Sequence, residues 1–305
     1  MTTLSHLDAG PTAPAQFKPE GRSGRGPFVS RGRARSRRQA PLHLAIIFLV
    51  LVGLAPYLFM LTTSVKDNQQ FAESYWLPAF PLHFENYSTA WGQISPYLLA
   101  SLIVAAGSIV LIIAISLLSG FILARYRFVG RTFFFTMIAA LMMIPGIASL
   151  IPLFVMVRDL GLINTYWVLM VPHVGGGVVL GTILMKTFIE SIPQSLFDAA
   201  QIDGAGGVRL FSSIMLPLSL PVIGTVGLIT INGVWNDFFW PLLTVTENEL
   251  RTASVGLLFF QSQTGSNYGP MFAGYLLASL PLLLLFTFLS KYFLAGVQGG
   301  LPGSH

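Results

Sequence analysis

The fold is decided by the stretch at residues 97–124, which reads YLLASLIVAAGSIVLIIAISLLSGFILA. It holds no Asp, Glu, Lys or Arg over its whole length. A helix that spans a membrane needs about 20 consecutive apolar residues, because each residue adds about 1.5 Å along the axis. We therefore predict a transmembrane helix at this stretch.

Five further stretches satisfy the same length criterion. The composition agrees with them, because 53% of the 305 residues are hydrophobic and only 10% are charged, whereas soluble domains carry about 25% charged residues. Much of the protein surface must therefore face lipid. We predict an all-α, polytopic membrane protein with six transmembrane helices. The other five lie at residues 42–63, 133–157, 163–187, 216–242 and 271–295.

Positive charge is distributed unevenly along the chain. Eight of the 17 Lys and Arg residues fall within the first 40 positions. Loops rich in Lys and Arg stay on the cytoplasmic side of a membrane. With the N-terminus there, six spans place most other basic residues on the same side, so we predict that both termini are cytoplasmic. The inner side then holds Arg125, Arg127, Arg131, Lys186, Arg209 and Lys291, and the outer side holds Lys66, Arg158 and Arg251.

The chain divides into four segments. Residues 1–40 are rich in Gly, Pro, Ser and Arg and have few large apolar side chains, so we predict a disordered basic tail. Because a membrane span follows directly, its arginines are interpreted as a topology anchor, and no nucleic-acid partner is expected. Residues 41–95 hold the first span and an outer loop, residues 96–295 hold the other five spans, and residues 296–305 form a cytoplasmic tail.

The outer segment at residues 64–96 is amphipathic and rich in aromatic residues. Two compatible interpretations fit it: a belt that lies at the membrane interface, or a docking surface for a partner outside the cell. Its aromatic side chains are Tyr75, Trp76, Phe80, Phe84, Tyr87 and Trp91.

Helix-breaking residues occur within four of the predicted spans. Proline removes a backbone donor and glycine weakens a helix, so freed backbone groups need partners from neighbouring helices or water. Gly and Pro are frequent in membrane helices, yet their density around the fourth span favours a protein that moves or encloses a cavity. The breakers are Pro145, Gly146, Pro152, Pro172, Gly175, Gly176, Gly177, Pro217, Pro221, Gly224, Gly274 and Pro281.

Few polar residues lie at membrane depth, where ionisable groups are costly and often functional. His173, alone in the fourth span, is interpreted as a packing residue or as a pathway residue. Asp237, near the outer end of the fifth span, either forms structural hydrogen bonds or lines a pathway. Asn232, Trp235 and Asn236 are further pathway candidates, and Trp235 is either a stacking surface for a cargo or an interfacial tryptophan. We expect no charged pair within the spans.

The inner loop between the fourth and fifth spans is the most specific feature, and residues 190–217 read ESIPQSLFDAAQIDGAGGVRLFSSIMLP. Pro193 suits the first turn of a helix, with Ser191 as its N-cap. We expect Gly204 to end this helix. A second amphipathic helix should then carry Phe211 and Ile214 into the fifth span. Small residues leave a smooth face that another protein can approach closely.

This loop resembles the signature of binding-protein-dependent ABC importer permeases, which runs Glu-Ala-Ala, then Asp-Gly-Ala, then Ile-x-Leu-Pro. One position departs from the pattern, because Asp198 stands where the family usually has Glu. The charge is kept on a shorter side chain, so the departure affects contact geometry rather than fold. The matching residues are Asp198, Ala199, Ala200, Asp203, Gly204, Ala205, Ile214, Leu216 and Pro217.

Three other stretches resemble the carbohydrate branch of that family, in particular the second membrane subunit of the maltose permease. They are Glu85-Asn86-Tyr87, residues 162–167 (LINTYW) and residues 235–238 (WNDF). The resemblance covers roughly residues 40–298. Near the C-terminus the family's usual Gly-Ala-Val-Lys-Gly is replaced by residues 299–303 (GGLPG).

The resemblance implies a type I ABC importer transmembrane domain at residues 96–295, in a bacterial cytoplasmic membrane. It also implies that the signature residues couple the chain to two copies of a cytoplasmic ATP-binding subunit. A second permease subunit should complete a heterodimer, and an extracytoplasmic solute-binding protein should deliver a di- or oligosaccharide. A glycerol-phosphate compound is the rival cargo.

The chain itself shows no signature of catalysis. It has no Gly-x-x-x-x-Gly-Lys-Ser/Thr, so we expect no cofactor of its own and expect ATP to be used by a partner. It has no Cys, no His-Glu-x-x-His and no Gly-x-Ser-x-Gly, so neither an enzyme nor a metal site is expected. A channel or secondary transporter is the alternative transport class, and the sparse intramembrane charge argues against it.

Overall fold

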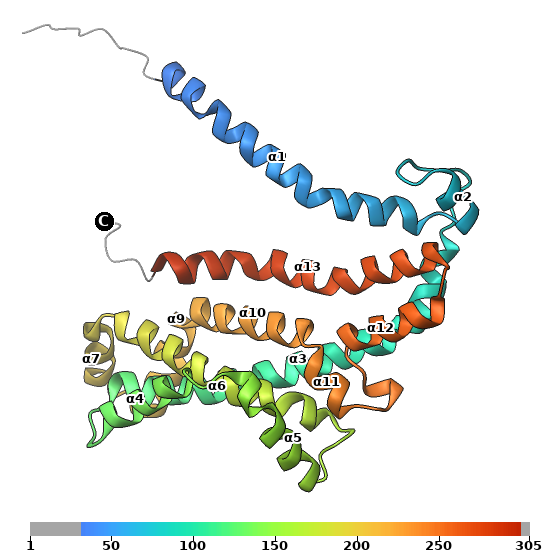
Figure 1. Ribbon diagram of the computed structural model, residues 1–305. Coiled ribbons are helices and arrows are strands. Elements are labelled where there is room, and N and C mark those ends of the chain that lie inside the picture. The colour runs from blue at the N-terminus through green and yellow to red at the C-terminus, as the bar shows by residue number, and fades with distance from the viewer. Residues whose placement is uncertain (1–31, 300–305) are drawn as a thin grey trace, which may run out of the picture. The chain divides into compact units, whose positions relative to one another are not determined.

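The computed structural model describes residues 32–299, with side chains at 41–288, and this part of the chain is helical without strands (Figure 1). The chain divides after Gly53 into two units, which are described separately. Four helices of the described part are long and apolar enough to cross a membrane, and two bent helix pairs raise the number to six. These correspond to the six predicted stretches, and the predicted fold class is confirmed.

Helix α1 (Gly32–Ser64) begins earlier than expected, inside the segment for which we predicted disorder up to residue 40. Residues 33–40 are Arg, Ala, Ser and Gln, with no Gly or Pro, and Ala, Arg and Gln favour helices. The rest of the predicted tail, residues 1–31, lies outside the described residues. The first unit therefore contributes the N-terminal part of α1, and the second unit contains everything that follows Gly53.

Helices α3 (Glu85–Arg125) and α6 (Tyr166–Ser191) form the central pair of the second unit. Their backbones approach closely where α3 presents Ser116 and Gly120 and α6 presents Gly181. A Cβ atom on Gly120 would lie 2.7 Å from Cβ of Met185. Small residues are the usual means by which membrane helices pack this tightly.

The third predicted span is strongly bent. Helix α4 (Arg131–Leu141) and the segment Gly146–Asp159, which comprises η1 (Gly146–Ser149) and α5 (Leu150–Asp159), meet at 88°. The break includes Pro145, as the sequence predicted, because proline cannot donate the backbone bond that would continue the helix. Pro152 lies in the first turn of α5, where a missing N–H costs little.

Helix α6, in contrast, runs without interruption through Pro172 and the three glycines at 175–177. The helix-breaking residues of the fourth span therefore do not interrupt the helix. The carbonyl of Val168 would normally bond the N–H of residue 172, which is proline. Indole Nε1 of Trp240 donates to that carbonyl at 2.7 Å instead, inside the protein. A neighbouring helix thus supplies the missing donor and keeps α6 intact.

The inner loop contains four short helical segments before the fifth span: α7, α8, the π-helix η2 and α9. The fifth span itself, α10 (Leu220–Asn236), is bent by 69° from the segment Gly207–Leu218. It ends earlier than the predicted residue 242, because Asp237 leaves the helical conformation. The four segments are α7 (Gln194–Ile202), α8 (Gly207–Arg209), η2 (Leu210–Met215) and α9 (Leu216–Leu218).

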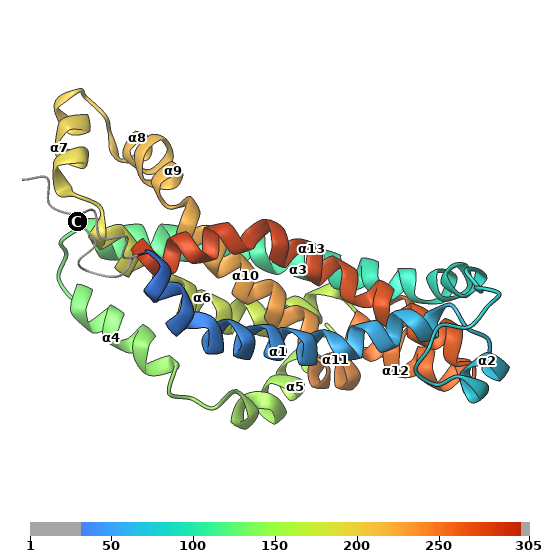
Figure 2. The same ribbon diagram turned by 90° about the horizontal axis from the view of Figure 1, so that it is seen from above.

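The remaining elements of the second unit are α2, the helices α11 to α13 and the short segment η3. Helix α2 (Asn68–Glu73) lies at the opposite end from α7 in both views (Figures 1 and 2). Helix α13 carries the sixth span and packs against α3 and α10, and it continues through Pro281. The last elements are α11 (Phe239–Thr244), η3 (Asn248–Leu250), α12 (Ala253–Thr264) and α13 (Tyr268–Gly299).

Candidate coupling loop and translocation pathway

Helix α7 is ended by a glycine-based C-cap. Gly204 adopts φ +81°, a left-handed conformation that residues with a Cβ rarely adopt. The N–H of Gly204 donates to the carbonyl of Gln201 at 3.0 Å, and the N–H of Ala205 donates to that of Ala200 at 2.9 Å. A left-handed glycine that closes a helix in this way is a common C-cap. Gly204 therefore ends the helix as predicted.

The start of α7 differs from the prediction. Pro193 precedes the first helical residue instead of occupying the first turn. The hydroxyl of Ser191 donates to the carbonyl of Phe188 at 2.6 Å, within the last turn of α6. Ser191 therefore does not cap α7, because its own helix already uses its side chain.

The inner loop is anchored by Arg125 at the end of α3. Its guanidinium donates to Oε1 of Gln194 at 2.8 Å and to the carbonyls of Ile189 and Ile192. The same group lies 4.0 Å from the ring centre of Phe197, which is buried. From the sequence, Arg125 was expected only to lie on the inner side. Its position opposite the loop depends on the pairing of α3 with α6, which local sequence does not reveal.

Two ion pairs fix the end of α6. Glu190 accepts from Arg131 at 2.7 Å and from Lys186 at 2.8 Å. With Arg125, these contacts connect α3, α4, α6 and α7 at one end of the protein. The loop is therefore held in a defined position rather than left free.

The signature residues divide into two groups. Asp198, Ala199, Asp203 and Gly204 are exposed on α7 and its C-cap, while Ala200 and Ala205 are half-buried. An apolar neighbour, Ile202, is 86% exposed. A single exposed aliphatic side chain is ordinary on a protein surface and does not by itself mark an interface. In the second group, Ile214 and Leu216 pack against the core below the loop, and Pro217 is exposed.

The second group of signature residues lies in a segment with two irregularities of the backbone, a π-helical turn and a bend. Residues Leu210–Met215 are π-helical, and the chain bends at Ser219, whose N–H bonds the carbonyls of Met215 and Leu216. The predicted second amphipathic helix is therefore not a regular α-helix. Such π segments often occur at functional positions.

His173 is not a lone polar residue. Its Nε2 lies 3.1 Å from Oδ2 of Asp237, and each side chain is about one-fifth exposed, at 19% and 20%. Oδ1 of Asp237 also accepts from the N–H of Trp240 at 3.3 Å. The two predicted spans therefore share a contact between ionisable side chains, which is a charged pair only when His173 is protonated. The two partners are far apart in the chain, and only the packing of α6 against the end of α10 brings them together.

The other pathway candidates lie on two different faces of α10. Asn232 and Asn236 are exposed, and the amide of Asn236 donates to the Asn232 carbonyl at 2.9 Å. Trp235 is 8% exposed and packs in a core cluster with Ala90 and Ile94. In this structure its ring is not available to stack on a cargo.

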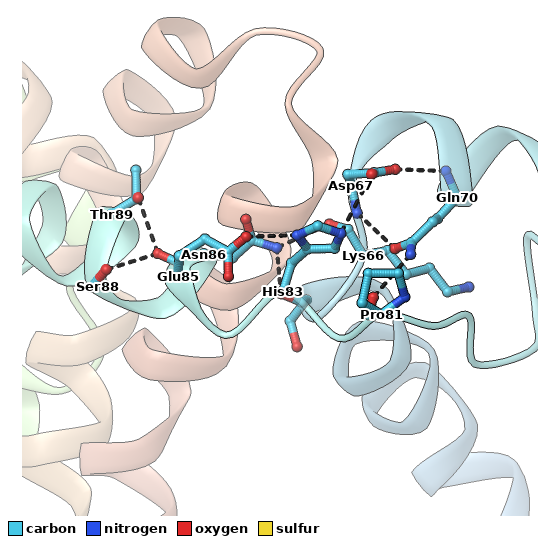
Figure 3. Close-up of polar contacts among 10 residues, drawn as sticks. Lys66, Asp67, Gln70, Pro81, His83, Glu85, Asn86, Ser88 and Thr89 are labelled. Carbon is cyan, nitrogen blue, oxygen red and sulfur yellow. Dashed lines mark hydrogen bonds and ion pairs between the residues drawn. The ribbon is translucent and has the colours of Figure 1, made fainter.

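The α2 end of the protein is held together by polar contacts around Lys66 (Figure 3). Its side chain is fully buried, and Nζ donates to the Ser74 carbonyl at 2.6 Å. Burial lowers the pKa of Lys66. His83 lies between two carboxylates, with Nδ1 2.6 Å from Glu85 and Nε2 3.4 Å from Asp67. These contacts hold the segment before α3 against the end of α1.

The aromatic residues of the outer segment are partly packed and partly exposed. Tyr75 and Trp76 pack around Phe59, with ring centres 5.1 Å apart in both pairs. Trp76 and Phe80 nevertheless remain 70% and 81% exposed. The exposed rings fit an interfacial belt and a docking surface equally, so both interpretations remain predictions.

Within residues 32–299, an all-helical arrangement with up to six candidate spans and an anchored, exposed loop is that of a polytopic membrane protein. Residues 116–299 match the family described as the binding-protein-dependent transport system inner membrane component. This is more than half of the chain, and the chain belongs to that family.

Curated relatives agree with this assignment. The chain is 33% identical to the probable ABC transporter permease protein YurM of Bacillus subtilis, over 83% of this chain and 85% of the relative. It is 30% identical to the melibiose/raffinose/stachyose import permease protein MelC of the same organism, over 87% and 98%. It is 32% identical to the maltodextrin transport system permease protein MdxG, also of B. subtilis, over 85% and 91%.

The fold matches a chain in the crystal structure of a bacterial ABC transporter involved in the import of the acidic polysaccharide alginate. The TM-score is 0.69 at 22% identity, over 88% of this chain and 100% of that chain. The family resemblance drawn from the sequence is confirmed.

Proposed function

We propose that this permease subunit forms one half of the translocation pathway of an ATP-driven importer for di- or oligosaccharides. The anchored, exposed helix α7 is the observation that carries the proposal, because it presents a rigid surface through which motion of a partner can reach the spans. The relatives named for melibiose, raffinose and stachyose and for maltodextrin support the sugar cargo.

In this proposal α7 faces the cytoplasm and docks into an ATP-binding subunit, present in two copies. Asp198 and Gly204 are coupling residues, since both are exposed on α7 or its C-cap. The ATP is bound and hydrolysed by those partners. Displacement of α7 would be transmitted through the Arg125 contacts to α3 and through the bend at Ser219 to α10.

The pathway would lie along the polar face of α10, which carries Asn232 and Asn236, and beside the His173–Asp237 pair. Exposed amides in an otherwise apolar span are costly against lipid. They are satisfied where they face a second permease subunit or a water-filled path. A solute-binding protein outside the membrane would deliver the cargo to the α2 end, by analogy with the alginate transporter in complex with a periplasmic protein.

The experiment is purification of the tagged chain from its native membrane in mild detergent, with its partners identified by mass spectrometry. We expect an ATPase subunit and a second permease subunit in the complex. Gly204→Trp should remove the ATPase subunit but leave the second permease subunit bound. Isolation of the chain alone in every detergent tested would contradict the proposal.

The His173–Asp237 pair favours one rival, because an ionisable pair at membrane depth is what an ion-coupled transporter requires. The energy source distinguishes an ATP-driven importer from an ion-coupled secondary transporter. An importer takes up cargo only with ATP and its ATPase subunits, whereas a secondary transporter takes up cargo when an ion gradient alone is imposed.

A further inference from the structure

An apolar groove of about 560 Å³ lies between the end of α3 and the segment that follows α7. Leu118, Ile122 and Tyr126 form its α3 wall, and Val208 and Phe211 form the opposite wall. Its size falls within the range of small-molecule sites, roughly 300–1,000 Å³. The groove is separate from the exposed face of α7 and from the His173–Asp237 pair.

The groove residues are unusually exposed for apolar side chains. Leu118 is 53% exposed, Ile122 is 40% exposed and Val208 is 83% exposed. Phe121 contacts Phe211 at a ring-centre distance of 5.5 Å and closes the floor. A contiguous apolar hollow of this kind is normally covered by a partner, a ligand or lipid.

The depth of the groove fits one leaflet of a membrane. Leu118 and Tyr126 are eight residues apart near the end of a span, which corresponds to roughly 12 Å along the helix. Half of a bilayer hydrocarbon core is about 15 Å. The α3 wall is therefore long enough to accompany an acyl chain through most of one leaflet.

Two arginines directly follow groove-lining residues in the chain. Arg127 follows Tyr126 in the chain, and Arg209 follows Val208. Both side chains are exposed, and neither has a hydrogen bond or ion pair within the part of the chain that the structure describes. The neighbouring Arg125, in contrast, is paired. Basic residues at the cytoplasmic edge of membrane helices attract anionic lipid headgroups.

We propose that this groove binds one acyl chain of an anionic phospholipid, whose phosphate is bound by Arg127 and Arg209. An apolar groove with two exposed arginines next to its lining residues in the chain matches the chemistry of such a lipid. Because Val208 and Phe211 belong to the segment between α7 and the bend at Ser219, bound lipid would support the coupling loop from below. The inference rests on the proposed function only for the assignment of the leaflet as cytoplasmic.

The test places a fluorescent reporter in the groove of the full purified complex. Val208→Trp is reconstituted into phosphatidylcholine nanodiscs that contain increasing fractions of brominated phosphatidylglycerol or brominated phosphatidylcholine. Bromine quenches tryptophan on contact. The five native tryptophans are corrected for with the unsubstituted complex.

We expect half-maximal quenching at a lower fraction of brominated phosphatidylglycerol, by about fivefold for each arginine that binds the headgroup. Arg127→Gln with Arg209→Gln should abolish the preference while quenching by both lipids persists. Arg158→Gln, at a different part of the chain, should leave the preference unchanged. Equal quenching by the two lipids in the unaltered background would overturn the proposal, because the headgroup would then not be recognised.

Absence of quenching by either lipid would also overturn it and would indicate that protein covers the groove. The proposed function is checked in the same samples by an independent reading, which is whether ATPase subunits co-purify. A complex with ATPase subunits but without lipid preference refutes the lipid site alone. Lipid preference without ATPase subunits refutes the importer assignment alone.

Discussion

At the scale of single residues, Trp240 and Pro172 form a compensating pair. Pro172 deprives the Val168 carbonyl of its partner within α6, and Trp240 restores one from outside the helix. A buried carbonyl without a partner costs about 1–3 kcal/mol. The pair thus explains how a span that contains proline remains continuous.

Trp240→Phe should lower the stability of the purified complex by about 1–3 kcal/mol, because the Val168 carbonyl would lose its donor. In the background Pro172→Ala, the same substitution should cost less, since the backbone N–H of the introduced alanine would bond that carbonyl. Thermal unfolding of the four proteins in a double-mutant cycle measures the difference. Equal costs in the two backgrounds would show that the indole does not act through this bond.

Gly204 and Gly206 provide a matched pair in the coupling loop. A Cβ would meet nothing within 4 Å at either position, but only Gly204 has a positive φ. A left-handed conformation costs roughly 1–2 kcal/mol for a residue with a Cβ. Gly204→Ala should therefore reduce the population of the native loop about 5- to 30-fold, whereas Gly206→Ala should not. Cargo-stimulated ATP hydrolysis of the assembled complex reports the effect, and equal activity of the two variants would contradict it.

Asp237 and His173 test the pathway assignment. Asp237→Asn keeps an acceptor for the Trp240 N–H but removes the negative charge beside His173. If the pair lines the pathway, transport KM or its pH dependence should change while complex assembly and unfolding temperature stay the same. If the pair is purely structural, stability should fall and transport by the surviving complex should be normal.

At the scale of elements, close contact between α3 and α6 depends on small residues at one face. Valine at position 120 would meet Cβ of Met185 and the backbone nitrogen of Lys186, which lies 3.0 Å from the position of an added Cβ. Backbone cannot yield as a flexible side chain can, so the helices would have to separate.

Gly120→Val should therefore destabilise the subunit by about 1–3 kcal/mol or more. Gly92→Val, on the same helix but with no atom within 4 Å, is the control and should be neutral. The unfolding temperature of the two variants in detergent decides the matter. Similar temperatures for both would mean that α3 and α6 are not packed as described.

The sequence predicted some of the helix breaks correctly but not all of them. Pro145 and the prolines around Ser219 mark real bends. Pro172 does not, because a tryptophan from a distant part of the chain supplies a donor to the carbonyl that the proline leaves free. Local sequence identifies where a helix can break, but tertiary contacts decide whether it does.

At the scale of the whole molecule, the length of the apolar stretches was sufficient to place the six candidate spans. The inner-loop signature was sufficient for the family. The His173–Asp237 pair and the Arg125 anchor were not predictable, because each joins residues that are far apart in the chain. The apolar groove proposed to bind lipid was not predictable either, because it forms where α3 packs against the π-helical segment.

In the proposed function, partner subunits cover the exposed amides of α10 and the exposed face of α7. Polar groups within a span need a partner or water. We therefore assign the pathway to an assembly in which this chain contributes one wall and one coupling surface.

The most direct test of the importer function is uptake of a labelled oligosaccharide by proteoliposomes that contain the complex purified through this chain. A solute-binding protein isolated from the same cells is added on the side of the α2 end. We predict uptake that requires both ATP and the binding protein, and that Gly204→Trp abolishes. Uptake that proceeds without ATP, or that persists undiminished in this variant, would contradict the central claim.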